Sequence, residues 1–194
     1  MKKTSLIFEN NQHPKAGGFL LSDPFMGDPF FERSVVYLCQ HDPEGTFGFV
    51  LNNPIGLKLN DVIDVDFEFD EPLFIGGPVA KNQLFFLHNL GDKILHSLPC
   101  GKNIFFSGDF DSLVLYIQEH GLEKIKIKFF VGYSGWDENQ LDKEIEEHSW
   151  IAVNNLPTHY VFEKDMQHFW KQCMEQQGAK FKMIANFPKN PNEN

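Results

Sequence analysis

Short runs of apolar residues in the first half of the chain predict β-strands. Residues 18–21 and 34–41 are rich in β-branched, aromatic and aliphatic side chains, and residues 46–51 form a third such run. Between the last two runs, Asp42-Pro43-Glu44-Gly45 has proline at the second position and glycine at the fourth position of a type I turn. We therefore expect residues 34–41 and 46–51 to form a β-hairpin.

Residues 63–70 alternate strictly between apolar and acidic side chains. Ile63, Val65, Phe67 and Phe69 would share one face of an extended chain, and Asp64, Asp66, Glu68 and Asp70 the other. The pattern favours a strand whose solvated acidic face protects a sheet edge. A calcium site is the alternative, but calcium loops wrap their ligands around one centre instead of laying them along a line. Further strands are predicted at residues 72–75, 84–88, 104–107 and 125–131.

Helical periodicity is confined to the second half. Asp109 is placed to cap a helix that Gly121 ends, a second helix follows Trp136, and a third is closed by Gly178. The inward-facing positions of the three helices are Phe110, Leu113, Val114 and Ile117; Leu141 and Ile145; and Met166, Phe169, Trp170 and Cys173. Strands that precede helices without one-for-one alternation predict an α+β fold with a largely antiparallel sheet.

Composition narrows the class of protein. At 194 residues the chain suits one domain, which we place at residues 1–188, followed by a disordered polar tail at 189–194. The 21 phenylalanines predict a core or an interface built on large rings. The net charge of −10 disfavours binding to nucleic acid and to anionic membranes.

The sequence predicts a cytoplasmic protein without a bound cofactor or metal. The apolar residues Leu6-Ile7-Phe8 stop too early for an export signal, and no stretch of eighteen apolar residues is present. Cys39, Cys100 and Cys173 are unclustered, so we expect free thiols, and no motif with metal-ligand spacing is found.

Arg33 is the only arginine in the chain and follows two Asp-Pro pairs at Asp23 and Asp28. Its planar fork of donors suggests a bidentate requirement that lysine does not meet. The favoured interpretation is a structural ion pair from Arg33 to Asp23 or Asp28. An anion-binding role and a chance occurrence are the alternatives.

Two other groups of residues invite a chemical reading. Cys39 and His41 share one face of a predicted strand, and Asn52 is expected to approach them, as in a cysteine hydrolase. Neighbours on one strand seldom reach catalytic geometry, so we expect His41 to stabilise the turn by a hydrogen bond. Gly76-Gly77 lacks the spacing of a phosphate-binding loop and favours a close crossing of two chain segments or a sharp turn between strands.

A glycine-rich segment at residues 132–136 resembles the nucleophile motif G-x-S-x-G. Trp136 replaces the last glycine, so Ser134 is not expected to act as a nucleophile. We expect a turn between a strand and a helix, anchored in the core by Tyr133 and Trp136.

Seven motifs in order make the chain similar to a known family. They are Gly18-Phe19-Leu20-Leu21-Ser22-Asp23-Pro24, Asp28-Pro29-Phe30-Phe31-Glu32-Arg33-Ser34-Val35, His41 with Gly45 and Gly48, Asn52-Asn53-Pro54, Gly76-Gly77-Pro78-Val79, Ser107-Gly108-Asp109 and Gly132-Tyr133-Ser134-Gly135-Trp136. Together they resemble the AlgH/YqgE family of bacterial proteins over residues 18–150, and the segment after about residue 150 looks lineage-specific. The resemblance implies a bifurcated sheet that includes a small closed barrel flanked by helices. It implies no catalytic residues, since members are uncharacterised or proposed transcriptional regulators.

Three classes of function remain open. The preferred one is a non-enzymatic regulatory or adaptor protein whose Gly/Pro-rich loops bind a protein or a small anionic ligand. Its candidate binding residues are Asp23, Asp28, Arg33, His41, Asn52, Gly76 and Gly77. The second is a hydrolase that uses Asp28, Arg33 and His41. The third is direct DNA binding through a basic stripe of Lys124, Lys126 and Lys128, although such lysines equally protect an edge strand from pairing. Self-association is left open.

Overall fold

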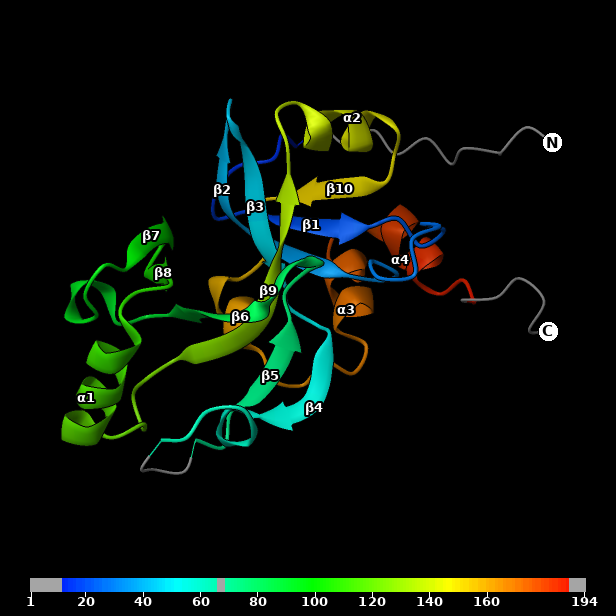
Figure 1. The fold of residues 1–194 in the computed structure, drawn as a ribbon. Helices are drawn as coiled ribbons and strands as arrows, with labels where there is room; N and C mark the ends of the chain where they lie inside the picture. Colours follow the sequence, from blue (N-terminus) through cyan, green and yellow to red (C-terminus); the bar gives the residue numbers. More distant parts are fainter. Residues whose placement is uncertain (1–11, 66–68, 189–194) are drawn as a thin grey trace.

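The computed structural model describes residues 12–65 and 69–188. In these ranges the chain forms one mixed, mostly antiparallel sheet with helices packed around it (Figure 1). The main path of the sheet runs β10 (Trp150–Val153), β1 (Phe19–Ser22), β2 (Val35–Asp42), β3 (Gly45–Val50), β9 (Ile127–Trp136), β6 (Val79–His88), β8 (Ile104–Phe106) and β7 (Leu98–Gly101). Off this path, β4 (Pro54–Lys58) pairs with β5 (Pro72–Ile75). The helices are α1 (Phe110–His120), α2 (Gln140–Glu146), α3 (Phe169–Glu175) and α4 (Ala179–Ala185), with 3₁₀ turns η1 (Leu59–Asp61), η2 (Gly91–Lys93) and η3 (Thr158–Phe162).

The sheet branches at the long strand β9. The end of β9 pairs antiparallel with β3, and the middle of β9 pairs parallel with β5 through Leu73↔Phe129 to Ile75↔Val131. On its other edge β9 pairs with β6. The sheet does not close on itself, because its outer strands β10 and β7 do not pair with each other. The α+β class is confirmed, whereas the expected small closed barrel is wrong.

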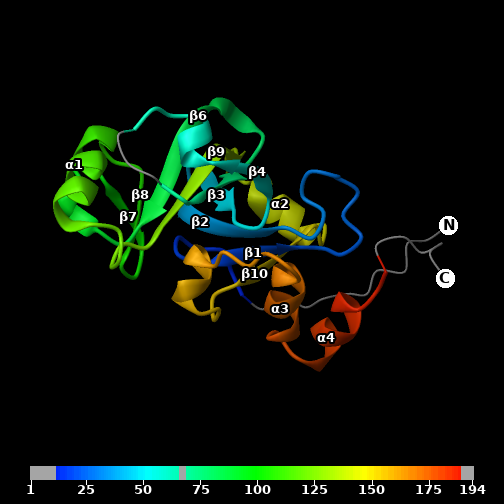
Figure 2. The ribbon, with the colours of Figure 1, turned by 90° about the horizontal axis from the view of Figure 1, so that it is seen from below.

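Strands β1, β2 and β10 are covered on both faces (Figure 2). On one side, Phe19, Leu21 and Val35 pack under α3, η3 and α4, and on the other side Leu20 and Val36 pack against the α2 region. This explains why these strands read as continuous apolar runs instead of alternating ones. A separate cluster, which includes Leu113 and Ile117 of α1, packs against β6 and the start of β9.

Several predicted elements are confirmed. Strands β2 and β3 form the expected hairpin, with a bulge at Cys39 between the pairs Leu38↔Gly48 and Gln40↔Phe47. Helix α1 begins after Asp109, whose carboxylate accepts a hydrogen bond of 2.7 Å from the Ser112 N–H, and it ends at Gly121, where φ is +73°.

Other elements differ from the prediction. Residues 63–65 and 69–70 form no strand, and residues 66–68 of that prediction lie outside the described ranges, as does the predicted tail at 189–194. Residues 132–136 continue β9 instead of forming a turn. Gly178 precedes a fourth helix, α4, that the periodicity did not predict. No helix in the described residues is long and apolar enough to span a bilayer.

Candidate functional site

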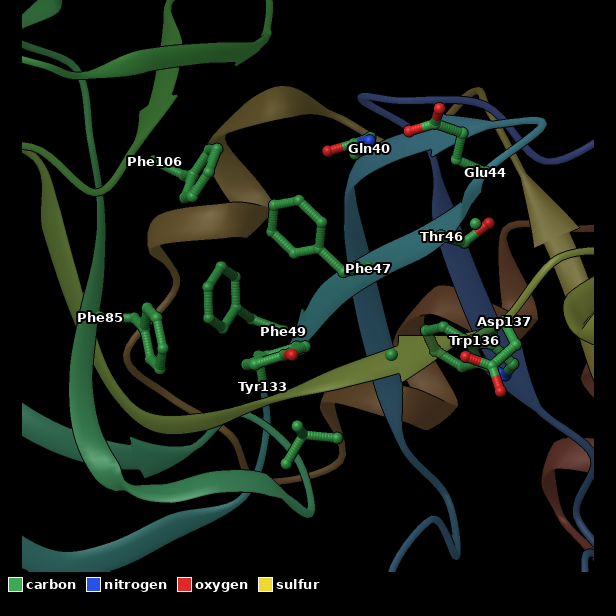
Figure 3. Close-up of a pocket in the computed structure, with 13 residues that line it drawn as sticks. Gln40, Glu44, Thr46, Phe47, Phe49, Phe85, Phe106, Tyr133, Trp136 and Asp137 are labelled. Carbon is green, nitrogen blue, oxygen red and sulfur yellow. The ribbon is translucent and has the colours of Figure 1, made fainter.

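A cavity of about 620 Å³ opens between β3 and β9 on one side and β6 and β8 on the other. Six aromatic residues line it, and the buried Trp136 of β9 is one of them. The other five form one group of contacting rings: Phe47 and Phe49 from β3, Phe85 from β6, Phe106 from β8 and Tyr133 from β9 (Figure 3). We call this site the aromatic cleft. Phe49 is fully buried and forms its floor, whereas the other four rings are only half-buried.

The rings of the aromatic cleft contact one another mostly edge to face, and Phe49 and Phe85 are tilted at 47°. The Phe47 ring lies 5.0 Å from the Phe106 ring and 6.1 Å from the Tyr133 ring, measured between centroids. Phe85 lies 5.7 Å from Tyr133 and 5.8 Å from Phe49. Mutual packing of this kind fixes ring orientation and leaves the outer faces free for a further apolar group.

Strand geometry explains how these rings gather. Phe47 and Phe49 are two apart on β3, so both side chains point to the same side of the sheet. Across the β3–β9 ladder Phe47 pairs with Gly135, which has no side chain to compete for the space above the strand. Tyr133 is two residues before Gly135 and therefore reaches the same face.

The open end of the aromatic cleft is polar and acidic. Gln40, Glu44, Thr46 and Asp137 line it, and Figure 3 shows Glu44 and Asp137 on the side of the site opposite Phe85 and Phe106. An adjoining cavity of about 440 Å³ shares Gly45, Thr46 and Asp137 and adds two further carboxylates, Asp42 and Asp142. No lysine or arginine lines either cavity.

Asp42 contributes a fixed negative charge to this rim. Its carboxylate accepts hydrogen bonds from the Gln40 side chain at 2.5 Å and from the Glu44 N–H at 2.9 Å. These hydrogen bonds lower the pKa of Asp42 below its usual value, and the bond from Gln40 has the largest effect. The group therefore stays ionised at neutral pH.

His41 has the role expected of it in the hairpin. Its Nδ1 lies 2.7 Å from the hydroxyl oxygen of Thr46, its partner across the β2–β3 ladder. The prediction of a turn-stabilising hydrogen bond is confirmed. His41 also lines the smaller acidic cavity, so it is the one sequence-predicted candidate that borders this site directly.

Arg33 does not form the expected ion pair. Its Nη2 donates a hydrogen bond of 2.6 Å to the Phe187 carbonyl, and its guanidinium lies 5.3 Å from the centre of the Trp170 ring. Within the described residues no ion pair joins Arg33 to Asp23 or Asp28. Arg33 thus has a structural role, as predicted, but the predicted partners are wrong. Its partners Trp170 and Phe187 lie far from it in the sequence.

Asp23 and Asp28 cap their own loop instead. Asp23 accepts a hydrogen bond of 2.7 Å from the Phe25 N–H, and Asp28 accepts one of 2.8 Å from the Phe30 N–H. Both are local turns of the kind that aspartate forms two residues ahead. They hold the shape of residues 23–33.

Asn52 is also engaged by the backbone. Its Oδ1 accepts from the Val35 N–H at 2.8 Å, and its Nδ2 donates to the Arg33 carbonyl at 2.9 Å. This pair of bonds braces Arg33, whose φ of +51° lies in the left-handed region. Arg33 and Asn52 together line a small cavity of about 270 Å³ beside Trp170, separate from the aromatic cleft.

Gly76 and Gly77 mark a close crossing of chain segments. A Cβ on Gly76 would collide with the Gly132 carbonyl, and a Cβ on Gly77 would collide with the Tyr133 backbone. The Gly76 carbonyl accepts a 3.0 Å hydrogen bond from the buried Ser134 hydroxyl, so Ser134 is no nucleophile. The prediction of a crossing is confirmed, and it sits beneath Tyr133 of the aromatic cleft.

The predicted catalytic residues are not brought together. Arg33 precedes β2 and His41 lies near the far end of this strand, so at about 3.3 Å per residue they are more than ~20 Å apart. Asn52 lies at the Arg33 end. Burial raises the pKa of the Cys39 thiol well above its usual value, which opposes thiolate formation. The geometry therefore opposes both hydrolase arrangements considered from the sequence.

The predicted basic stripe is wrong as well. Lys128 is only 3% exposed and turns inward, while Lys124 and Lys126 are exposed and precede β9. Strand β9 pairs with β3, β5 and β6, so these lysines do not protect a sheet edge either.

Sequence reasoning missed the aromatic cleft because its rings come from four strands. The abundance of phenylalanine was the available signal, and it predicted an interface without saying which rings form it. The described residues contain no group of three or more His, Cys, Asp or Glu side chains that is arranged to hold a metal ion.

Comparisons with known proteins agree with the motif order. A family model described as AlgH-like matches residues 19–182. A UPF0301 protein from Cytophaga hutchinsonii is 41% identical, with 92% of this chain and 98% of the relative covered. Another from Parabacteroides distasonis is 41% identical, with 95% and 94% covered.

Solved structures share the fold. The solution structure of the AlgH protein from Pseudomonas aeruginosa matches with a TM-score of 0.68 at 26% identity, covering 91% of this chain and 97% of that one. A crystal structure of a protein from Corynebacterium diphtheriae matches with a TM-score of 0.73 at 21% identity, covering 91% and 94%. On the family model and the relatives of 41% identity, this chain belongs to the AlgH-like family.

Proposed function

We propose that this protein is a non-enzymatic adaptor or regulatory protein whose aromatic cleft binds a basic segment of a partner protein. The segment inserts one apolar or aromatic side chain between the rings, and its lysines or arginines face the acidic rim. The observation that carries the proposal is the group of half-buried rings that line a cavity of about 620 Å³.

The rings supply the binding energy in this proposal. Phe47, Phe85, Phe106 and Tyr133 keep part of their surface exposed although each is packed against another ring. Burying apolar surface is worth about 25 cal/mol per Å² before the costs of association. Rigid aromatic pockets are typical sites for a hot-spot side chain of a partner.

The acidic rim supplies the selectivity. Glu44, Asp137, Asp42 and Asp142 line the aromatic cleft and the adjoining cavity, and the whole chain carries a net charge of −10. Complementary charge speeds the encounter with a basic partner and disfavours acidic ones. Asp42 and Glu44 belong to the proline- and glycine-bearing turn of the β2–β3 hairpin, so in this proposal a Gly/Pro-bearing loop forms part of the binding site.

A random dodecapeptide library displayed on phage tests this proposal. We expect selection on the full chain to enrich peptides in which Phe, Trp or Leu is flanked by Lys or Arg. A labelled synthetic copy of the best peptide should then bind in fluorescence anisotropy. The double variant Glu44→Lys/Asp137→Lys should weaken it about tenfold, equivalent to ~1.4 kcal/mol.

The matched control is Glu119→Lys/Glu123→Lys. It makes the same change of net charge at two exposed positions that do not line the aromatic cleft, so the peptide should bind as to the unchanged protein. Equal weakening by both double variants would show that the peptide responds to the net charge of the protein and not to the acidic rim, which would contradict the proposal. Retained affinity in Phe106→Ala, after circular dichroism shows it folded, would also exclude the aromatic cleft.

A further inference from the structure

We propose that a second cavity, built around Lys102, Lys126 and His159, binds a small phosphate-bearing metabolite. This cavity has a volume of about 330 Å³, and Asn89, Asn103, Ile104, Thr158 and Phe162 complete its lining. None of these residues lines the aromatic cleft, so the inference does not depend on the proposed function.

Three separate parts of the chain bring Lys102, Lys126 and His159 to one cavity. Lys102 and Asn103 form the two-residue turn between β7 and β8, since Gly101 pairs with Ile104 across it. Lys126 directly precedes β9, and its N–H donates a 2.9 Å hydrogen bond to Oδ1 of Asn89. His159 lies on η3, which packs against β9. Convergence of this kind is the usual construction of a ligand site on a fixed scaffold.

The charges of this cavity run against those of the whole molecule. The chain carries a net charge of −10, yet no carboxylate lines the cavity. Within the described residues, neither Lys102 nor Lys126 forms an ion pair. Two lysines that face one hollow without an acidic partner leave a local positive charge that an anion can neutralise.

Two carboxylates of a neighbouring cavity are already engaged. Glu71 and Glu163 line a neighbouring cavity that shares Lys126, His159 and Phe162. Glu71 pairs with Lys164 at 2.6 Å. The Glu163 carboxylate accepts hydrogen bonds from the N–H groups of Lys164 and Asp165, at 2.9 and 3.1 Å.

The remaining lining suits phosphate esters. Hydrogen bonding of Asn89 Oδ1 to Lys126 leaves the amide nitrogen of Asn89 as a donor, and the Thr158 hydroxyl is exposed at the same cavity. Ammonium, amide and hydroxyl donors on residues that line one cavity suit the oxygens of a phosphate group. The Phe162 ring offers an apolar surface for the carbon portion of the ligand.

Titration of the ¹⁵N-labelled full chain with inorganic phosphate and with glycerol 3-phosphate, followed by NMR, tests the proposal. We expect saturable amide shifts at Lys102, Asn103, Lys126 and His159, with tighter binding of glycerol 3-phosphate because it adds a carbon portion. The double variant Lys102→Gln/Lys126→Gln should lose about tenfold in affinity, since it removes two charge-assisted hydrogen bonds.

Lys81→Gln/Lys143→Gln is the matched control. Both lysines are exposed and line none of the cavities described above, so affinity should stay unchanged. Shifts that do not saturate, or equal losses in the two double variants, would mean only diffuse attraction to lysines and would overturn the proposal. Sodium chloride at matched ionic strength separates phosphate binding from salt effects.

Discussion

Several polar side chains in this fold are held by hydrogen bonds to backbone groups. Lys128 stands out among them because its charged group is buried. Its side chain is buried, donates a 2.7 Å hydrogen bond to the Glu163 carbonyl and lies 3.9 Å from the centre of the Phe74 ring. Burial lowers the pKa of Lys128 to about 7, against weaker opposing effects of the Glu163 and Glu71 charges. An ordinary lysine in the unfolded chain has a pKa near 10.4.

This difference predicts how stability depends on pH. Above pH 7 the unfolded chain binds more protons at Lys128 than the folded chain does, so stability should rise with pH. Between pH 7 and 8.5 the gain from this lysine is about 2 kcal/mol. Urea unfolding at both pH values should show the gain, and Lys128→Met should remove it.

Two buried thiols oppose this gain at the upper end of the pH range. Burial raises the pKa of the Cys173 thiol to about 12 and that of Cys39 well above its usual value. Thiols of the unfolded chain lose protons around pH 8.5, so these groups offset part of the gain near pH 8.5 and reduce stability as pH rises further. Lys124→Met, at an exposed lysine, is the control and should keep the gain. A gain that survives in Lys128→Met would contradict the assignment.

At the level of elements, the sequence predicted correctly those features that depend only on residues close together in the chain. The capping of α1 by Asp109 and the Asp42-Pro43-Glu44-Gly45 turn depend on neighbouring residues, and both were predicted. Alternation at residues 63–70 was misleading, because a strand forms only by pairing into a sheet, and residues 63–65 and 69–70 belong to no strand of the sheet. The β9 extension through residues 132–136 was missed, because its glycines signal close packing against other strands as readily as a turn.

The crossing at Gly77 tests this account of the glycines. A methyl group on Gly77 would collide with backbone atoms of Tyr133 and Ser134, which cannot move without breaking the sheet. We expect Gly77→Ala to destabilise the fold by about 3 kcal/mol or more, in the range of severe core overpacking. Thermal unfolding followed by circular dichroism measures the loss.

Gly27→Ala is the comparison. A Cβ at Gly27 would meet no atom within 4 Å, so stability should change by less than about 0.5 kcal/mol. Equal melting temperatures for Gly77→Ala and the unchanged protein would show that the strands part easily here. In that case the floor beneath Tyr133 would not be rigid.

Across the whole molecule, the sites depend on contacts that sequence patterns do not encode. The aromatic cleft joins Phe47, Phe85 and Phe106 across nearly sixty residues, and the cavity proposed to bind a phosphate ester joins Lys102 to His159. Periodicity indicates which face of a strand is apolar, but strand pairing at such separations is decided by the global packing. The sequence singled out Arg33 correctly but assigned it the wrong partners. Asp23 and Asp28 were the carboxylates nearest to it in the sequence, whereas its partners lie in the C-terminal segment.

Arg33 joins two parts of the chain that are 154 residues apart. Its bond to the Phe187 carbonyl and its position over Trp170 fix the end of α4 against the loop at residues 23–33, where Phe25 also lies 5.9 Å from the Phe187 ring.

Lysine keeps the charge but lacks the planar fork and its stacking. Arg33→Lys should therefore lower the free energy of unfolding by about 1–2 kcal/mol. Hydrogen exchange measured by mass spectrometry should show faster exchange concentrated in residues 179–188, while Lys81→Met, at an exposed lysine, leaves it unchanged. Unaltered exchange in that segment of Arg33→Lys would show that α4 is held by its buried Ile184 and Ala185 alone, and Arg33 would have no role in holding the C-terminal segment.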